Sequence, residues 1–144
     1  MFINVSMAPP KFKMWQAKNV AVDPWKGRDQ EFVVFFKNPK FTKPDGKTNK
    51  YMHDTELQHA NSIIKNGIDY KKSKVSYSFG NWFNRFNLKD FKENALFWRP
   101  PNITIVVQIP RNVIEKEDGS WVTYRPVPPE WIVGVYSYDK NDIL

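Results

Sequence analysis

Alternating apolar and polar positions along the chain predict a sheet built of many short strands. The two most apolar segments, Glu31–Lys37 (EFVVFFK) and Ile103–Ile109 (ITIVVQI), are rich in β-branched and aromatic residues, which is typical of strands buried on both faces. Ser120–Arg125 (SWVTYR) alternates strictly, and Trp131–Tyr138 (WIVGVYSY) is the last predicted strand. Shorter strands are expected at 2–7, 51–53 and 74–79.

Two helices are predicted between these strands. The clearer one is expected to begin at Thr55, because Thr55 and Gln58 have the spacing of a capping box and apolar residues recur at helical spacing after them. Gly67 supplies the left-handed residue that ends such a helix. The second pattern runs from about Asn87 to Pro100. Strands outnumber helices, so we expect an α+β fold: a mixed or antiparallel sheet with two or three helices.

Composition is that of one globular domain spanning residues 1–144. The chain is 41% hydrophobic and 26% charged, long enough for one core and too short for two full-sized domains. It contains no cysteine, which excludes a disulfide framework, a thiolate metal site and a cysteine nucleophile. We expect no metal site, no membrane-spanning segment and no export signal, and therefore a cytoplasmic protein.

The net charge of +7 is concentrated in the front half of the chain. Residues 1–50 carry +6, residues 51–100 carry +3 and residues 101–144 carry −2. Between Lys37 and Lys50 the lysines are spaced by Pro, Asn, Asp and Gly, which predicts a long solvated loop. This basic N-terminal half either serves solubility or faces an anionic macromolecule, such as nucleic acid or an acidic protein surface.

The usual short catalytic motifs are absent: the sequence has no phosphate loop, GxGxxG, GxSxG or HExxH. Instead, several short pieces follow one another in a recognisable order. They are YMHDT at 51–55, SIIKNGI at 62–68, a strand containing Tyr77, ITIVVQIP at 103–110 and VPPEWI at 127–132. Over residues 51–137 this order resembles the ADP-ribosyltransferase superfamily of diphtheria-like toxins, poly-ADP-ribose polymerases and nucleic-acid-modifying relatives.

The resemblance implies an ADP-ribosyltransferase-like core that binds NAD. It implies that His53 binds the adenosine-side ribose, that Thr55 helps to hold the ligand and that Tyr77 stacks on nicotinamide. Arg85 is a candidate partner for the pyrophosphate, because a guanidinium fits phosphate oxygens. Each residue also has a structural interpretation: a carbonyl partner for His53, helix capping for Thr55, core packing for Tyr77 and a solvated surface position for Arg85.

The third position of the family pattern, a glutamate at the start of a later strand, departs from expectation. The residue there is Ser120. A loop shift brings Glu117 into consideration, and Glu130 is the alternative if EWIVGVY is aligned with the corresponding segment of polymerase relatives. Loss of the catalytic acid, with ligand binding retained, is a third alternative.

Two functional hypotheses of different classes follow. The first is an enzyme that transfers ADP-ribose from NAD to a protein or nucleic acid, in the setting of a phage or bacterial effector, with Glu117 or Glu130 as the acid. The second is a non-catalytic binding module: either a degenerate relative that binds a nucleotide or protein partner, or a basic, aromatic nucleic-acid-binding domain with Trp82 and Phe83 lining a cleft. The sequence leaves the oligomeric state open.

Overall fold

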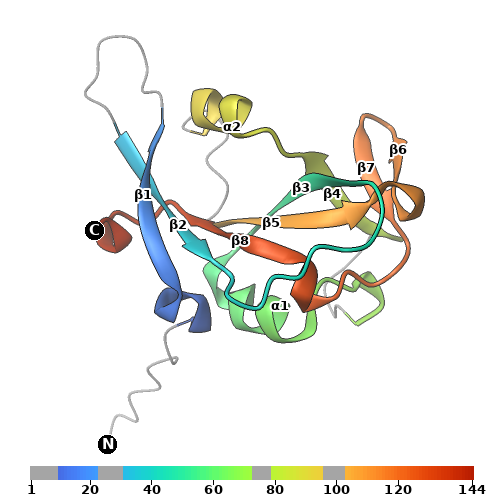
Figure 1. Ribbon diagram of the computed structural model, residues 1–144, viewed down its shortest axis with the longest axis horizontal. Coiled ribbons are helices and arrows are strands. Elements are labelled where there is room, and N and C mark those ends of the chain that lie inside the picture. The colour runs from blue at the N-terminus through green and yellow to red at the C-terminus, as the bar shows by residue number, and fades with distance from the viewer. Residues whose placement is uncertain (1–9, 23–30, 73–78, 96–102) are drawn as a thin grey trace, which may run out of the picture.

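The computed structural model describes residues 10–22, 31–72, 79–95 and 103–144, which form one antiparallel sheet and two α-helices (Figure 1). The strands lie side by side in the order β1-β2-β8-β5-β3-β4-β7-β6. An α+β fold with an antiparallel sheet, as predicted, is confirmed. The bounds of the strands are β1 (Gln16–Val22), β2 (Glu31–Lys37), β3 (Thr48–Thr55), β4 (Asn81–Arg85), β5 (Ile103–Pro110), β6 (Glu115–Glu117), β7 (Ser120–Thr123) and β8 (Ile132–Ser137).

Strand β5 is the centre of the sheet and is buried along almost its whole length. Five consecutive residues from Ile103 to Val107 are buried, because β3 and β8 pair with its two edges and other elements cover both of its faces. The prediction from ITIVVQI is confirmed here. The β2 strand was expected to be equally buried, but its side chains are only partly so, since Phe32 is 42% exposed.

The two helices lie on opposite faces of the sheet. Helix α1 (Ala60–Asn66) lies below the sheet in Figure 1, and α2 (Leu88–Asn94) lies above it. Each face has its own apolar cluster: one includes Ala60 beneath the sheet, and the other includes Phe91 of α2. Both helices have only seven residues, and no helix in the described ranges is long and apolar enough to cross a membrane.

The entry into α1 differs from the predicted capping box. Thr55 is the last residue of β3, and the chain reaches α1 through a 3₁₀ turn, η2 (Leu57–His59), in which no side chain caps the first residue. Thr55 is therefore not a helix cap, because pairing of β3 with β5 extends as far as Thr55 and Ile103. The predicted end is confirmed: Gly67 has φ +78°, and a side chain there would collide with the carbonyl of Val127.

Three strands, β1, β4 and β6, were not predicted from the pattern. Strand β1 has mixed polar and apolar residues and is stabilised by its seven-residue pairing with β2. Strand β4 lies in GNWFNRF, between β3 and β7. Short strands of this kind are selected by their neighbours more than by their own residues. The predicted strand at 2–7 and all but the last residue of the one at 74–79 lie outside the described residues.

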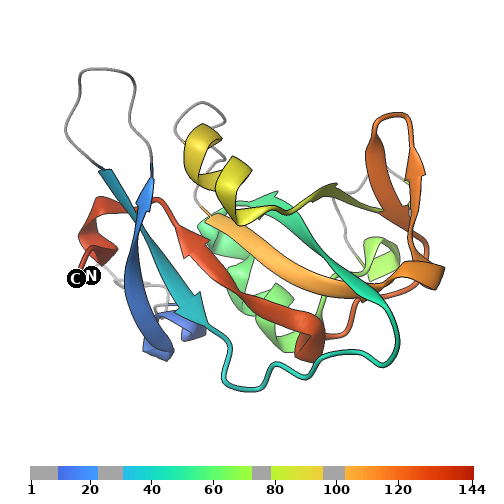
Figure 2. The same ribbon diagram turned by 45° about the horizontal axis from the view of Figure 1, so that its top comes forward.

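Other local predictions hold in part: the second helix, predicted from about Asn87 to Pro100, is α2 and ends at Asn94. Helix α2 begins at Asn87, whose side-chain oxygen accepts a hydrogen bond from the Asp90 amide at 3.2 Å. Asp118 and Gly119 both have positive φ, 50° and 80°, and form the two-residue turn between β6 and β7 at the far end of the sheet (Figure 2). The strand expected at 120–125 ends at Thr123.

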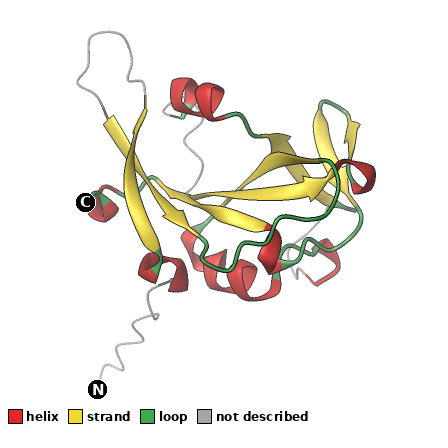
Figure 3. Cartoon of the chain, viewed as in Figure 1, coloured by secondary structure: helices red, strands yellow, loops and turns green. Residues whose placement is uncertain are grey.

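The lysine-rich segment is a loop only over residues 38–47, which is shorter than the predicted loop from Lys37 to Lys50, because Lys37 ends β2 and Thr48 begins β3. Figure 3 shows it as an irregular connection between β2 and β3. Its lysines at positions 40, 43 and 47 are exposed. The loop is attached to the sheet at Asn38, which is buried and whose side-chain amide donates to the carbonyl of Ile132 at 2.8 Å. The remaining short helical turns are η1 (Lys11–Met14), η3 (Tyr70–Lys72), η4 (Arg111–Val113), η5 (Pro129–Trp131) and η6 (Lys140–Asp142).

We predict that Gly134→Ala destabilises the fold by about 1–3 kcal/mol, because an added methyl group overpacks a filled site. A Cβ at position 134 would lie 2.5 Å from both the Phe35 ring and the Phe36 carbonyl oxygen. Urea denaturation measures the loss. Adding Phe35→Leu should recover part of it and no more, since the Phe36 carbonyl stays in place. An unchanged denaturation midpoint for Gly134→Ala would contradict this packing.

Candidate functional site

The side chains of β3 alternate between the two faces of the sheet. Tyr51 belongs to the apolar cluster on the α1 face, and Met52 packs against the cluster on the α2 face. Since successive side chains of a strand point to opposite faces, His53 shares the face of Tyr51, and Asp54 shares that of Met52. His53 and Asp54, although adjacent in sequence, therefore belong to separate surroundings.

His53 is held by contacts with the neighbouring strand β4. Its Nδ1 lies 3.3 Å from the carbonyl oxygen of Trp82, and its ring meets the Phe83 ring edge to face at 5.8 Å between centroids. A carbonyl oxygen only accepts hydrogen bonds, so Nδ1 carries the proton. In the neutral ring, Nε2 is then the hydrogen-bond acceptor.

Burial keeps His53 neutral at physiological pH. Desolvation lowers the pKa of His53 below its usual 6.5, and this outweighs the opposing effects of the Trp82 carbonyl and the Asp54 carboxylate. A neutral imidazole with Nε2 as acceptor suits a hydroxyl donor. The sequence allowed two roles for His53: a structural one, bonded to a backbone carbonyl, and a ligand-binding one. These roles are compatible, because they use different ring nitrogens.

Arg85 lies beside His53 on the same face. Arg85 pairs with Tyr51 across β3 and β4, and continuing that register sets His53 opposite Phe83. His53 and Arg85 are therefore diagonal neighbours, a relation in which the two Cα atoms are about 7–8 Å apart. The Arg85 guanidinium carbon lies 5.8 Å from the Tyr51 ring centroid and 5.9 Å from that of Trp121, so two aromatic faces hold the cation.

The first candidate acid, Glu117, is not brought to His53. It pairs with Ser120 across the β6–β7 hairpin, and its carboxylate accepts a hydrogen bond from the Tyr124 hydroxyl at 3.0 Å. This hydrogen bond raises the pKa of Tyr124. Trp121 contacts Tyr51 on the face of His53, so Ser120 and its partner Glu117 lie on the opposite face.

The second candidate acid, Glu130, lies in the turn η5 that precedes β8. Its backbone carbonyl accepts a hydrogen bond from the Thr42 amide at 2.8 Å, and its side chain is exposed. Strand β8 begins at Ile132, level with Val107 and Tyr51, whereas His53 is level with Ile105 and Val135. Glu130 thus lies before the first residue of β8, and β5 separates β8 from β3, the strand of His53.

The two remaining candidates differ in what the structure says of them. Thr55 is 9% exposed at the end of β3, on the same face as His53 and two residues from it. Tyr77 lies outside the described residues. The structure therefore brings His53, Thr55 and Arg85 to one face of neighbouring strands, with the rings of Tyr51 and Phe83 between them.

A pocket on the opposite face contains polar residues that sequence reasoning missed. Its volume is about 160 Å³, near that of a cavity that holds one benzene-sized ring. In it Thr104 donates a hydrogen bond to Asp54 at 2.6 Å, and the Tyr138 hydroxyl, 3.2 Å from the Thr104 oxygen, donates in turn. Burial raises the pKa of Tyr138. The pocket is lined by Met52, Asp54, Arg85, Asn87, Asp90, Phe91, Asn94, Ala95, Thr104 and Tyr138. Arg85 thus borders this pocket as well, although its guanidinium lies over the Tyr51 and Trp121 rings on the other face.

These residues come from three strands, a helix and the segments next to them, so no local sequence motif predicts the pocket. The only sequence signal was the position of Asp54, directly after His53. Within the described ranges, no group of three or more His, Asp or Glu side chains is placed to hold a metal ion. The chemistry that the described side chains offer is hydrogen bonding, charge and aromatic contact.

We predict that Tyr51→Phe raises the free energy of unfolding by about 1–2 kcal/mol. The Tyr51 hydroxyl is buried and has no hydrogen-bond partner among the described residues, and such a group carries an uncompensated desolvation cost. Urea denaturation gives the change. Tyr124→Phe is the matched control, because its hydroxyl is bonded to Glu117 at an exposed site and its loss should bring no gain. A loss of stability in Tyr51→Phe would show that the hydroxyl is satisfied.

We predict that His53 makes the fold less stable as the pH falls below about 6.5. Its pKa is lowered in the folded protein, so the unfolded chain takes up the proton first, and stability declines as the pH drops from 6.5 toward the folded pKa. One proton contributes a slope of at most about 1.4 kcal/mol per pH unit. Denaturation between pH 5 and 7 should show a flatter profile for His53→Gln than for wild type, and an unchanged profile would refute the assignment. His59→Gln, at an exposed site, should retain the wild-type slope.

Comparisons with known proteins identify no relative. No protein-family model, curated protein or solved structure matches this chain. The placement of His53, Thr55 and Arg85 on one face, and of both candidate acids away from it, is therefore the observation from which a function has to be inferred.

Proposed function

We propose that this domain binds NAD on the face of His53 and transfers ADP-ribose to a macromolecular target. The observation that supports it best is the state of His53: a neutral ring with Nδ1 bonded to the Trp82 carbonyl and Nε2 left as acceptor, with Arg85 on the neighbouring strand. A ribose hydroxyl is a donor for Nε2, and a pyrophosphate is a partner for a guanidinium. NAD carries both groups.

The surroundings of His53 suit the other parts of a dinucleotide. Phe83 packs against His53, and Trp121 lies 5.5 Å from Tyr51 between ring centroids, so aromatic side chains cluster next to the histidine. Aromatic faces hold planar rings such as a base or nicotinamide. Thr55 adds a hydroxyl at the end of the same strand. Tyr77 remains the predicted nicotinamide partner.

The proposed reaction is a substitution at the nicotinamide ribose. NAD supplies the ADP-ribosyl group when bound: the target's nucleophile forms a bond to the ribose carbon, nicotinamide leaves with the electrons of the broken C–N bond, and the nucleophile releases its proton. A carboxylate near the developing positive charge lowers the barrier of such a reaction. Glu117 and Glu130 are the proposed acids, and either would have to approach the His53 face when substrate binds.

A second candidate is a non-catalytic NAD-binding domain, and a specific observation favours it. Ser120 stands at the position where the family resemblance expects glutamate, Glu117 is hydrogen-bonded to Tyr124 on the opposite face, and Glu130 lies in the turn before β8. The residues that would hold the ligand are thus together, whereas an acid to drive transfer is not among them. In this candidate the protein binds the nucleotide without cleaving it.

Calorimetric titration with NAD tests the binding step. We expect His53→Gln and Arg85→Gln each to weaken binding by about 2–13-fold, the range for one lost hydrogen bond. His59→Gln and Arg111→Gln are matched controls at exposed sites and should bind as wild type does. Circular dichroism checks that each variant is folded. No binding by wild type, or equal binding by site and control variants, would overturn both candidates.

Release of nicotinamide, measured with protein, DNA and RNA as acceptors, then separates the two. The transferase candidate expects release that falls at least tenfold in Glu117→Gln or Glu130→Gln while NAD binding is kept. The binding candidate expects NAD affinity that depends on His53 and no release with any acceptor.

A further inference from the structure

A second pocket lies on the α2 face, on the side of the helix away from the pocket that contains Asp54. Its volume is about 370 Å³. Helix α2 separates the two pockets: Leu88 and Lys92, one turn apart, line this one, whereas Asp90 and Phe91 line the other. The full lining is Lys18, Asn19, Val20, Ala21, Phe35, Lys50, Phe86, Leu88, Lys92, Val106, Val133 and Tyr136.

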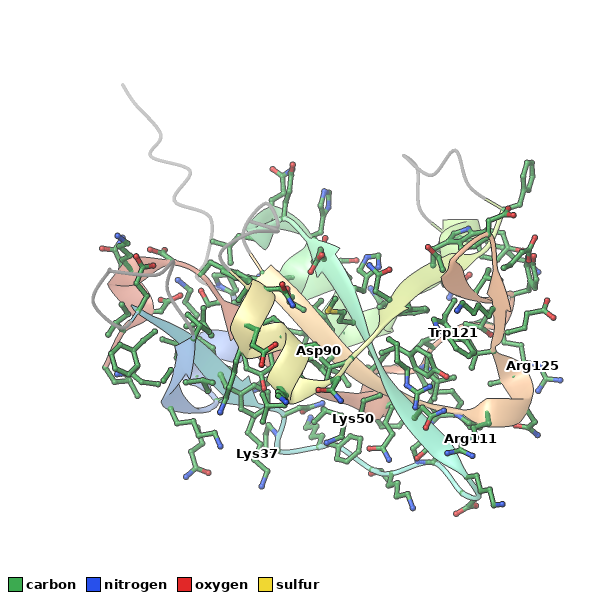
Figure 4. The ribbon with its side chains drawn as sticks, turned by 90° about the horizontal axis from the view of Figure 1, so that it is seen from above. Lys37, Lys50, Asp90, Arg111, Trp121 and Arg125 are labelled. Atoms are coloured by element: carbon green, nitrogen blue, oxygen red, sulfur yellow. The ribbon has the colours of Figure 1, made fainter. Side chains whose placement is uncertain are left out.

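The charge of this pocket has one sign. Lys18 from β1, Lys50 from β3 and Lys92 from α2 line it, and its lining contains no carboxylate. Figure 4 looks onto this face, with Lys50 beside α2 and Asp90 on the helix itself. Lys37 lies on the same face. It pairs with Gly134, which pairs in turn with Val106, a residue that lines the pocket, and residues paired directly across strands share a face. Three separate elements thus bring lysines to one pocket.

The floor of the pocket is aromatic and apolar. Lys18, Phe35 and Tyr136 face one another in a single row across β1, β2 and β8. The Phe35 and Tyr136 ring centroids are 4.7 Å apart, and those of Phe86 and Tyr136 are 5.8 Å apart. Lys18 extends over the Phe35 ring, with 5.9 Å from its Nζ to the centroid. Burial raises the pKa of Tyr136 to about 12, so its hydroxyl adds no negative charge.

A basic rim around an aromatic floor is complementary to unpaired nucleotides. Lysines neutralise backbone phosphates, and a base without a pairing partner exposes a flat face for aromatic contact. A duplex hides those faces in its stack. An acidic protein surface would use the lysines and leave the floor unused. The other pocket on this face is lined by two carboxylates, Asp54 and Asp90, and by one cation, Arg85, so it suits a polyanion less well.

We propose that the pocket formed by Lys18, Lys50, Lys92, Phe35 and Phe86 binds single-stranded nucleic acid, with phosphates on the lysines and one base against the aromatic floor. The site lies on the face opposite His53. It needs neither NAD nor an acidic residue, and it stands whether or not the domain cleaves a nucleotide. Two of its three lysines, Lys18 and Lys50, belong to residues 1–50, where the excess positive charge is concentrated.

Fluorescence anisotropy with labelled twelve-nucleotide DNA and RNA single strands tests the site at several salt concentrations. The triple variant Lys18→Gln, Lys50→Gln, Lys92→Gln should bind at least tenfold more weakly than wild type. The slope of log affinity against log salt should shrink by about 2, since each single-strand phosphate contact contributes about 0.7.

The matched control removes the same charge elsewhere. Lys65→Gln, Lys72→Gln, Lys116→Gln changes three exposed lysines, of which Lys116 pairs with Trp121 and so faces away from the pocket. Both triple variants carry a net charge of +4, three less than the wild-type +7. The control should keep the wild-type affinity. Equal losses in both triples, or no binding by wild type at low salt, would overturn the proposal.

The aromatic floor has its own test. Phe86→Leu should weaken single-strand binding by about fivefold or more, because one base loses its aromatic contact. Phe41→Leu, in the loop between β2 and β3, is the control and should have no effect. The single-strand assignment would be overturned if a duplex bound as tightly as the single strands. It would also be overturned if inorganic polyphosphate bound as tightly and Phe86→Leu left single-strand affinity unchanged, because charge alone would then attract the ligand. The DNA and RNA arms identify which strand is preferred.

Discussion

Burial of β5 on both faces is the constraint on which the rest of the structure depends. Ile103, Ile105 and Val107 on one face, and Val106 on the other, lose their contact with water only if β3 and β8 pair with β5 and both faces are covered. Each fully buried aliphatic side chain contributes on the order of 1.5–3 kcal/mol. The short helices and marginal strands at the periphery, by contrast, owe their stability to this core.

That central strand also divides the protein into two chemical surfaces. Because a strand alternates its side chains, one step along β3 separates His53, which faces α1, from Asp54, which faces α2. The α1 face carries the neutral histidine, the Arg85 cation and their aromatic neighbours. The α2 face carries two pockets on either side of one helix: one is lined by three lysines and no carboxylate, and the other by Asp54, Asp90 and Arg85. Two distinct ligands, one on each face, are therefore compatible with so small a domain.

The proposed roles of the two faces complement each other. A nucleotide held by His53 and Arg85 and a single strand held by lysines would engage opposite sides of the same sheet. The acids are the weak point of the catalytic candidate. The register of the sheet fixes the backbone of Glu117 and Glu130 away from His53, so rotation of their side chains does not bring the carboxylates to it. Transfer would require backbone movement, whereas binding requires none.

Local pattern determined the elements whose residues carry their own signal. The β5 run, the Asp118–Gly119 turn, the Gly67 helix end and the start of α2 at Asn87 follow from β-branched content, left-handed conformations and side-chain capping, which act over a few residues. The sequence also placed the excess charge in its front half, and it marked His53, Thr55 and Arg85, which do share one face. Tertiary structure alone decided strands β1, β4 and β6, the loss of the Thr55 cap, the separation of both acids from His53, and the meeting of Lys18, Lys50 and Lys92. The reason is physical: strand pairing and the face that a side chain occupies depend on register between segments far apart in the chain, and no single segment contains that information.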